Sequence, residues 1–183
     1  MTDIANWDRL NIIRQDAVWF FGSERKRDKQ QLKRFCDYLE FVLCYIYAYG
    51  WQDAEEIIGT VPKPDGLDDK AVNLEIDGMT FRDRITADMT VEEALRLIDT
   101  EAHRDYNTGV YDAAKVSGKQ GLRKRWNTMR DDKVRDPHSY MEGMTVGLDD
   151  RFYTYTGDST LYPGGFGVPE LDINCRCYIT LTA

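Results

Sequence analysis

The sequence predicts an α+β protein in which an N-terminal helical arm precedes a small domain of helices and antiparallel strands. Apolar residues recur at three- and four-residue steps through the first sixty residues, as in amphipathic helices. Pro62 and Pro64 then interrupt this pattern, since proline is not tolerated inside helices. In the last third, short alternating apolar runs stand between glycine- and proline-containing turns, which is typical of strands. We therefore expect an arm at 1–60, a linker at 61–76 and a domain at 77–183.

The arm is expected to contain two main helices. The first covers residues 3–21, and Ser23 can cap a second helix that Gly50 ends. Residues 35–49 are apolar on most sides, so one neighbouring helix cannot cover them. Two interpretations stay open, because this segment is either an internal core helix or an aromatic surface for another protein. The candidate partner-binding residues are Phe35, Leu39, Leu43, Ile46 and Tyr49.

The region that joins the two halves predicts a short helix and a hairpin. Residues 51–58 fit a third helix. After the linker prolines, 72–76 and 79–81 can pair as strands around the turn signal Asp77-Gly78. We place the domain boundary in this region because of its prolines.

The next helix has the clearest local signal. Thr90 and Glu93 form a capping box at its start, with the side chain of each bonded to the backbone of the other. An apolar stripe follows, and we expect the helix to end near 107–109 and to resume briefly at 111–116.

The last third is expected to form strands and one short helix. In order, these are a strand at 122–129 centred on Trp126, a helix at 138–141 after Asp136-Pro137, strands at 145–148 and 152–155, a loop at 157–169 and a strand at 173–182. In the last strand, Cys175 and Cys177 share one face with Ile173 and Ile179. This alternation predicts that both sulfurs lie in the core.

Composition limits the classes of function. The net charge of −8 argues against a general nucleic-acid coat, because phosphate binding needs clustered cations. Of the four cysteines, Cys36 and Cys44 would lie about 12 Å apart along one helix, beyond disulfide reach. With no signal peptide at the start, a reducing compartment is expected. The most apolar run, 41–49, is too short to span a membrane.

Polar and sulfur-containing residues suggest two alternatives for chemistry. The set His103, His138, Cys175 and Cys177 is competent to bind zinc, and a cysteine beside His138 could act as a nucleophile. Cysteines at alternate positions of a regular strand are more often buried and inert, so we expect no metal, no cofactor and no catalysis. We prefer a structural polar network formed by Glu101, Arg104, Asn107, Asp132, Arg135 and His138.

Residues 115–135 form a cationic segment. It contains eight basic residues, and Asp131 and Asp132 are its only acidic ones. Most such segments are solvated faces, but an aromatic residue among cations also suits non-specific contact with DNA phosphates. The candidates for DNA contact are Arg123, Lys124, Arg125, Trp126 and Arg130.

Several short motifs stand in a fixed order in the second half of the chain. They are Thr80–Arg84, the series Glu101, Arg104 and Asn107, then Trp126, Val134-Arg135-x-x-His138, Gly143, Tyr162-Pro163-Gly164 and Asn174-Cys175-Arg176-Cys177. This order resembles the C-terminal domain of the phage Mu F-like head morphogenesis proteins, also called minor head or minor capsid proteins. The resemblance runs from about residue 77 to the C-terminus, with Glu142 where the family more often has Asp.

The resemblance implies a structural or assembly protein of a tailed-phage head, made in the host cytoplasm and located in the virion at the portal vertex or inner capsid. It implies as partners the portal protein, the major capsid protein or further copies of the chain, and non-specific DNA, with no membrane. The alternative is a phage-encoded effector or a zinc-dependent enzyme that uses His138 with Cys175 or Cys177. The short length of the chain favours the structural role. We expect the arm to dock on a partner while the domain folds independently.

Overall fold

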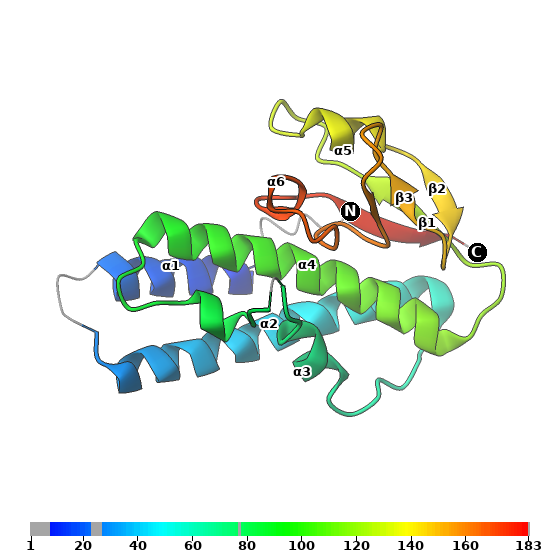
Figure 1. The fold of residues 1–183 in the computed structure, drawn as a ribbon. Helices are drawn as coiled ribbons and strands as arrows, with labels where there is room; N and C mark the ends of the chain where they lie inside the picture. The colour runs from blue at the N-terminus through cyan, green and yellow to red at the C-terminus, as the bar shows by residue number, and fades with distance from the viewer. Residues whose placement is uncertain (1–7, 23–26, 77, 183) are drawn as a thin grey trace.

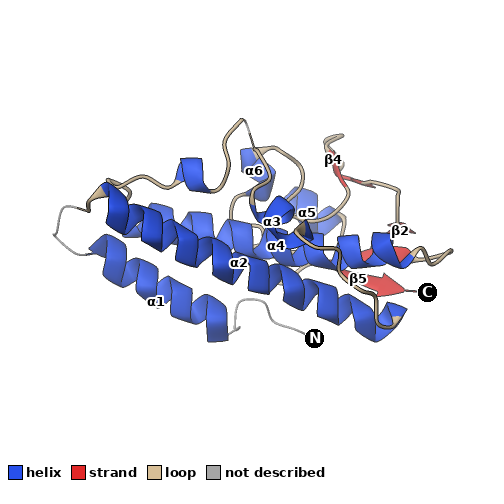
Figure 2. Cartoon of the chain, turned by 90° about the horizontal axis from the view of Figure 1, so that it is seen from below, coloured by secondary structure: helices blue, strands red, loops and turns tan. Residues whose placement is uncertain are grey.

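Three long helices form one layer of the molecule. The computed structural model describes residues 8–22, 27–76 and 78–182, so Ser23, the expected cap, lies outside the described residues. The layer consists of α1 (Asp8–Gly22), α2 (Lys29–Ile58) and α4 (Val91–Ser117). The strands lie on one side of the second half of α4 (Figure 1), at one end of the helical layer (Figure 2).

The β layer is built from short antiparallel strands. The remaining elements are α3 (Leu67–Val72), a 3-10 turn at Arg82–Arg84, β1 (Arg123–Asn127), α5 (Asp136–Tyr140), β2 (Thr145–Gly147), β3 (Phe152–Tyr153), β4 (Ser159–Thr160), α6 (Pro169–Asp172) and β5 (Tyr178–Thr182). One sheet has the order β2-β1-β5. In the other, β3 lies within the strand expected at 152–155, and its partner β4 lies in the segment expected to be a loop. Helices followed by a small antiparallel sheet confirm the α+β fold class.

Helix α2 is continuous through Gly50, which corrects the expected stop. It begins with a capping box in which the Asp28 carboxylate accepts from Gln31 N at 2.7 Å and Gln31 Oε1 accepts from Asp28 N at 3.1 Å. It ends at Gly59, whose φ is 78°. The short helix predicted at 51–58 is therefore the last part of α2.

Gly50 lies where α2 crosses α4. A Cβ atom at Gly50 would be 2.0 Å from the carbonyl oxygen of Tyr106, and one at Gly109 would be 2.1 Å from that of Tyr47. Each glycine thus faces the backbone of the other helix, and the two backbones approach more closely than side chains allow. Gly50 breaks no helix here because it serves this contact.

The apolar part of α2 packs inside the chain. Of the five side chains expected to bind a partner, Phe35, Leu39, Leu43 and Ile46 are buried, and Tyr49 alone is exposed, by 37%. The expected surface is therefore not presented to a partner, because α1 and α4 flank α2 and the buried side chains join one core with theirs. The interpretation as an internal core helix describes these four residues.

The segment expected to be a linker is packed onto the helices. Val72 of α3 is fully buried, and Trp51 Nε1 donates to the carbonyl oxygen of Val61 at 3.1 Å. Of the expected hairpin, Ile76 and Met79 form one antiparallel pair, with backbone bonds of 2.9 and 3.0 Å. Arm, linker and domain residues belong to one hydrophobic cluster. Independent folding of residues 77–183 stays a prediction, and the shared core argues against it.

Helix α4 begins as expected but is longer. Thr90 and Glu93 form the capping box, with Thr90 N donating to Glu93 Oε2 at 2.8 Å. The helix then runs without a break to Ser117 and ends at Gly118, whose φ is 61°. Gly109 does not interrupt it, because the packing against α2 supports the helix there.

The strands position two of the motifs. β1 alternates, with Arg123 and Arg125 exposed and Lys124 and Trp126 buried. β5 begins only at Tyr178, which corrects the strand expected from residue 173. The segment with the two cysteines is an irregular turn rather than part of a regular strand.

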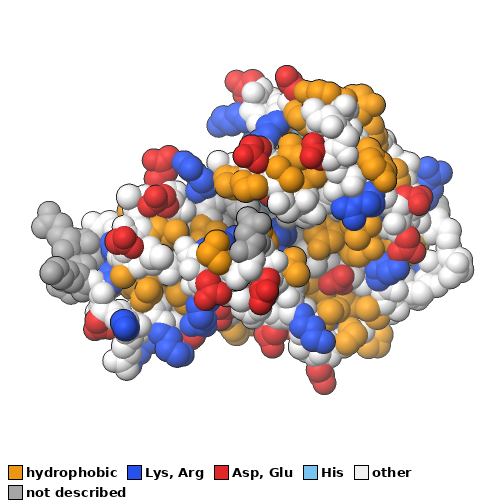
Figure 3. All heavy atoms as spheres, viewed as in Figure 1, with side chains coloured by type: hydrophobic (Ala, Val, Ile, Leu, Met, Phe, Trp, Pro, Cys, Tyr) orange, Lys and Arg blue, Asp and Glu red, His pale blue; other side chains and the backbone are white. Residues whose placement is uncertain are grey.

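The surface mixes charged and apolar groups. Figure 3 shows apolar side chains gathered over the β layer, where Tyr140, Tyr153 and Tyr155 are exposed. Among the helices that the structure describes, none combines the length and apolar character that crossing a membrane requires.

Candidate functional site

The turn after α6 brings both cysteine side chains to the same point. Asn174 adopts φ 57°, in the left-handed region, and Cys175 N donates to Asp172 O at 3.1 Å. Asparagine tolerates this conformation better than most residues. The chain then enters β5 directly after Cys177.

Two arginines and Thr100 of α4 hold this turn in place. Arg135 donates to the carbonyl oxygens of Leu171 and Ile173. Arg176 makes a two-pronged ion pair with Asp131, at 2.8 and 2.7 Å. The hydroxyl of Thr100 accepts from Asn174 N at 3.1 Å. The arginines of both motifs therefore position the backbone that carries the cysteines.

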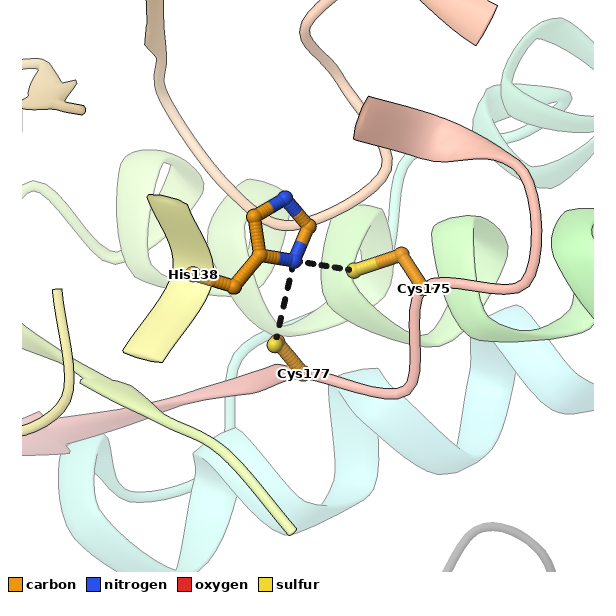
Figure 4. Close-up of side chains that lie close together, drawn as sticks. All are labelled: His138, Cys175 and Cys177. Carbon is orange, nitrogen blue, oxygen red and sulfur yellow. Dashed lines mark hydrogen bonds between the residues drawn. The ribbon is translucent and has the colours of Figure 1, made fainter. Parts of the chain in front are cut away.

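His138 of α5 points at the two sulfurs (Figure 4). Its Nδ1 lies 3.6 Å from Cys175 Sγ and 3.5 Å from Cys177 Sγ. The imidazole stacks on Phe166, with ring centroids 5.6 Å apart, and Trp126 meets it edge-on at 5.5 Å. All three polar side chains are buried, since His138 is 1% exposed and each cysteine is 3% exposed. Two aromatic rings thus fix the histidine in a cluster closed to bulk solvent.

The two thiols have opposite electrostatic tendencies. The hydrogen bond from the Cys177 thiol, supported by His138, holds the pKa of Cys175 well below its usual range, although burial opposes this. The Cys175 sulfur and burial raise the pKa of Cys177. Of the two thiols, Cys175 therefore loses its proton more readily, but its burial makes attack on an external substrate unfavourable.

Asn107 joins α4 to the start of β5. Its Nδ2 donates to Cys177 O at 3.1 Å, and its Oδ1 accepts from Ile179 N at 3.0 Å. The same amide donates to the carbonyl oxygen of His103 at 2.8 Å. Asn107 thus satisfies both backbone groups that flank Tyr178.

A second polar cluster lies on α4. Glu101 accepts from Arg104 Nε at 2.9 Å and from Arg84 Nη1 at 2.8 Å, with Glu101 itself fully buried. Arg104 also forms an ion pair of 3.2 Å with Asp105. Burial raises the pKa of Asp105 to about 7, although Arg104 opposes the shift. Two carboxyl groups and two guanidinium groups therefore share one buried site.

The expected single network is in fact three separate arrangements. Glu101 accepts hydrogen bonds from Arg84 and Arg104, Asn107 holds β5, and His138 faces the cysteines. Asp132 is exposed and Arg135 bonds backbone carbonyls, so neither joins the others. Sequence reasoning did not include Arg84 or Asp105 among these residues. Asp105 could have been found from its position, because it follows Glu101 by four residues on the same face of α4.

The expected zinc set is divided as well. His103 Nδ1 bonds the carbonyl oxygen of Asp99 at 2.8 Å. The group whose ligand atoms lie within 4.8 Å of one another is His138, Cys175 and Cys177. His103 instead lines a pocket of about 450 Å³ together with Arg14, Lys133 and Arg176.

The expected DNA-contact set is partly buried. Lys124 Nζ donates to the carbonyl oxygen of Leu148 at 2.7 Å, and burial lowers the pKa of Lys124 to about 8. Trp126 is fully buried in the core. Both are thereby removed from any DNA surface, because β1 alternates between core and solvent. Arg123 and Arg125 are exposed, and Arg130 is paired with Glu142 at 2.8 Å.

Comparison with known proteins identifies the family. Residues 69–180 match the family described as Phage Mu protein F like protein. The chain is 36% identical over 89 residues to an NAD(+)--arginine ADP-ribosyltransferase EFV of Enterococcus faecalis, covering 47% of this chain and 18% of that protein. It is 29% identical over 79 residues to Minor head protein GP7 of Bacillus phage SPP1, covering 43% of this chain and 26% of that protein. No solved structure matches.

The family match contains all the motifs of the second half of the chain, from Thr80–Arg84 to Asn174–Cys177. It begins in α3, ahead of the expected boundary at residue 77, and includes Glu101, His138 and both cysteines of the turn. The chain spans about a fifth to a quarter of the length of these two curated relatives. Since the match covers more than half of the chain, this protein belongs to the Phage Mu protein F like family.

Proposed function

We propose that this chain is a minor structural protein of a tailed-phage head. The observation that carries the proposal is the family match over residues 69–180, which one relative named as a minor head protein supports. The contacts of the motif residues agree with a structural role. Glu101, Asn107 and Arg135 each bond groups inside the chain, so these residues stabilise the fold rather than face a substrate.

The proposal includes a place in the virion, at the portal vertex or the inner capsid wall. The partners we propose are the portal protein, the major capsid protein or further copies of this chain. Aromatic side chains on the outer face of α2 support a protein contact, because Phe41, Tyr45 and Tyr49 are exposed by 58%, 39% and 37%. Their four-residue spacing puts them on one side of the helix. Exposed apolar stripes of this kind suit protein interfaces.

Contact with packaged DNA is a narrower proposal. Of the expected cations, Arg123 and Arg125 stand on the solvent side of β1. Two exposed arginines support weak phosphate contact without reading of sequence. The net charge of −8 restricts any such contact to this local surface.

The alternative is an enzyme, which the relative named as an ADP-ribosyltransferase keeps open. The matched segment is only 18% of that protein, so the printed activity belongs to a much longer chain. We expect the purified chain to release no nicotinamide from NAD in the presence of an arginine analogue. An enzyme would be favoured if nicotinamide were released well above a blank without protein, and if this release were lost on substitution of one carboxylate residue.

The test of the structural role is the composition of phage particles. We expect mass spectrometry of purified virions from the phage that encodes this chain to detect it in a few copies per head. A double variant, Phe41→Asp with Tyr45→Asp, is expected to fold normally but to be depleted from particles. The matched control is Tyr153→Asp on the β layer, because Tyr153 is exposed by 57% and Phe41 by 58%. Absence of the chain from normal, filled heads would contradict the proposal.

A further inference from the structure

The cluster of His138, Cys175 and Cys177 has the geometry of a metal site. A tetrahedral zinc ion binds sulfur at about 2.3 Å and nitrogen at about 2.0–2.1 Å, which sets the sulfur-to-nitrogen distance at about 3.6 Å. The two observed distances from Nδ1 to sulfur are 3.6 and 3.5 Å. All three ligand atoms lie within 4.8 Å of one another. The two sulfur-to-nitrogen distances are therefore those that a shared zinc ion would require.

The two cysteines do not belong to a regular strand. β5 begins after Cys177, and the left-handed Asn174 turns the chain so that both sulfurs face His138. Arg135 and Arg176 fix the two sides of this turn. Metal sites hold their ligands in a fixed orientation through neighbouring residues, as the two arginines do here.

There is also room for a fourth ligand. A hollow of about 10 Å³ is bordered by His138, Cys175 and Cys177. This is close to the space that one water molecule needs. Two thiolates, a neutral imidazole and a divalent cation have no net charge together, which suits a buried position.

We propose that His138, Cys175 and Cys177 bind one zinc ion, with a water molecule as the fourth ligand. Zinc suits this donor set because thiolate and imidazole ligands in tetrahedral geometry favour it. The ion ties α5 to the turn before β5 and so stabilises the β layer. None of the three ligands is more than 3% exposed, so we expect the ion to act on the stability of the fold. The proposal does not depend on a role in the phage head.

The first test measures metal content. The full chain, purified under reducing conditions, is incubated with zinc chloride, dialysed and analysed for metal. We expect about one zinc ion per chain and a lower melting temperature after chelation. Cys175→Ser and Cys177→Ser should each lower zinc retention at least tenfold. Cys44→Ser is the matched control, because Cys44 is a half-buried cysteine of α2 whose thiol contacts Asp69.

The second test does not require any variant to fold. Cobalt(II) bound by thiolates in a tetrahedral site gives intense absorption, and we expect this spectrum on titration of the wild-type chain. Zinc should displace it. Failure to retain zinc, together with no thiolate-to-cobalt absorption, would overturn the proposal and leave a hydrogen-bonded core cluster. Equal zinc retention by the two serine variants would overturn it as well.

Discussion

At the scale of single residues, Glu101 is the acceptor that two arginines share. Its fully buried carboxylate bonds Arg84 and Arg104, so replacing it leaves two guanidinium groups without this partner in the interior. Breaking a buried ion pair from one side costs about 3–5 kcal/mol. We expect Glu101→Ala to lower the free energy of unfolding by about that amount in chemical denaturation.

The matched control for Glu101 is Glu92→Ala on the same helix. Glu92 pairs with Arg96 at 2.9 Å, but its side chain is 83% exposed. Solvent screens such a pair, so we expect little change in stability. Equal effects of the two substitutions would contradict the buried charge cluster.

Asp105, at the same site, makes a pH-dependent contribution to the stability of the fold. Burial raises its pKa from 3.8 to about 7, so the folded chain keeps the proton that the unfolded chain releases. The native state therefore binds more protons between about pH 4 and pH 7, and stability falls as pH rises through this window. Asp105→Asn should remove this slope. We expect wild type to lose stability relative to the variant from pH 4 to pH 7, and the difference to stay constant above it.

Measuring that difference cancels the other titrating groups. Burial also lowers the pKa of His103, so His103 titrates in an overlapping pH range. Its effect cancels because His103 is present in both the wild type and the variant. A difference that does not vary with pH would show that Asp105 is already ionised in the folded protein at low pH.

At the scale of elements, the crossing of α2 and α4 determines how the helices pack. Replacing glycine by alanine inside a helix normally stabilises it by about 1 kcal/mol. Here a Cβ atom at Gly50 or Gly109 would meet a backbone oxygen at 2.0 or 2.1 Å. We expect Gly50→Ala and Gly109→Ala to destabilise the chain instead, by about 1–3 kcal/mol or more, because the helices must separate. Thermal denaturation followed by circular dichroism measures this.

Gly22→Ala provides the control for the crossing. Its Cβ atom would meet Val91 Cγ2 at 3.6 Å, an ordinary contact at the end of α1. We expect it to be neutral or slightly stabilising. Stabilisation by all three substitutions would mean that the two backbones do not touch in solution.

The same elements show how far sequence reasoning reaches. The capping box at Thr90 and the strand expected at 122–129 around Trp126 rest on local signals, and both predicted real elements. Gly50 does not end the helix as expected, because a helix-ending glycine and a helix-packing glycine cannot be distinguished until the partner helix is known. His138 and the two cysteines belong to one candidate set in the sequence. Their convergence depends on the turn at Asn174, which the alternation of residues 173–182 does not reveal.

At the scale of the whole molecule, the arm and the family domain share one core. The matched region begins at residue 69, yet the side chains of α4 that it contains, such as Ala102 and Val110, join a cluster with Leu43 and Ile46 of α2. The arm therefore completes the domain, and acidic substitutions at Leu43 or Ile46 would disrupt folding rather than test binding to a partner. The exposed stripe of Phe41 and Tyr45 remains as a surface of the arm that can make contacts.

The shared core leads to a prediction about truncation. A fragment of residues 69–183 keeps all the Mu F-like motifs but exposes the face of α4 that α2 covers, including Tyr106 and Gly109. Each large apolar side chain left uncovered forfeits about 1.5–3 kcal/mol, and few small domains have that much stability in reserve. We expect the fragment to lose its cooperative unfolding transition and to bind a hydrophobic dye. Adding residues 1–60 as a separate chain should restore the transition. A sharp transition in the fragment alone would instead show that the family domain folds independently, and would return the arm to the role of a docking segment.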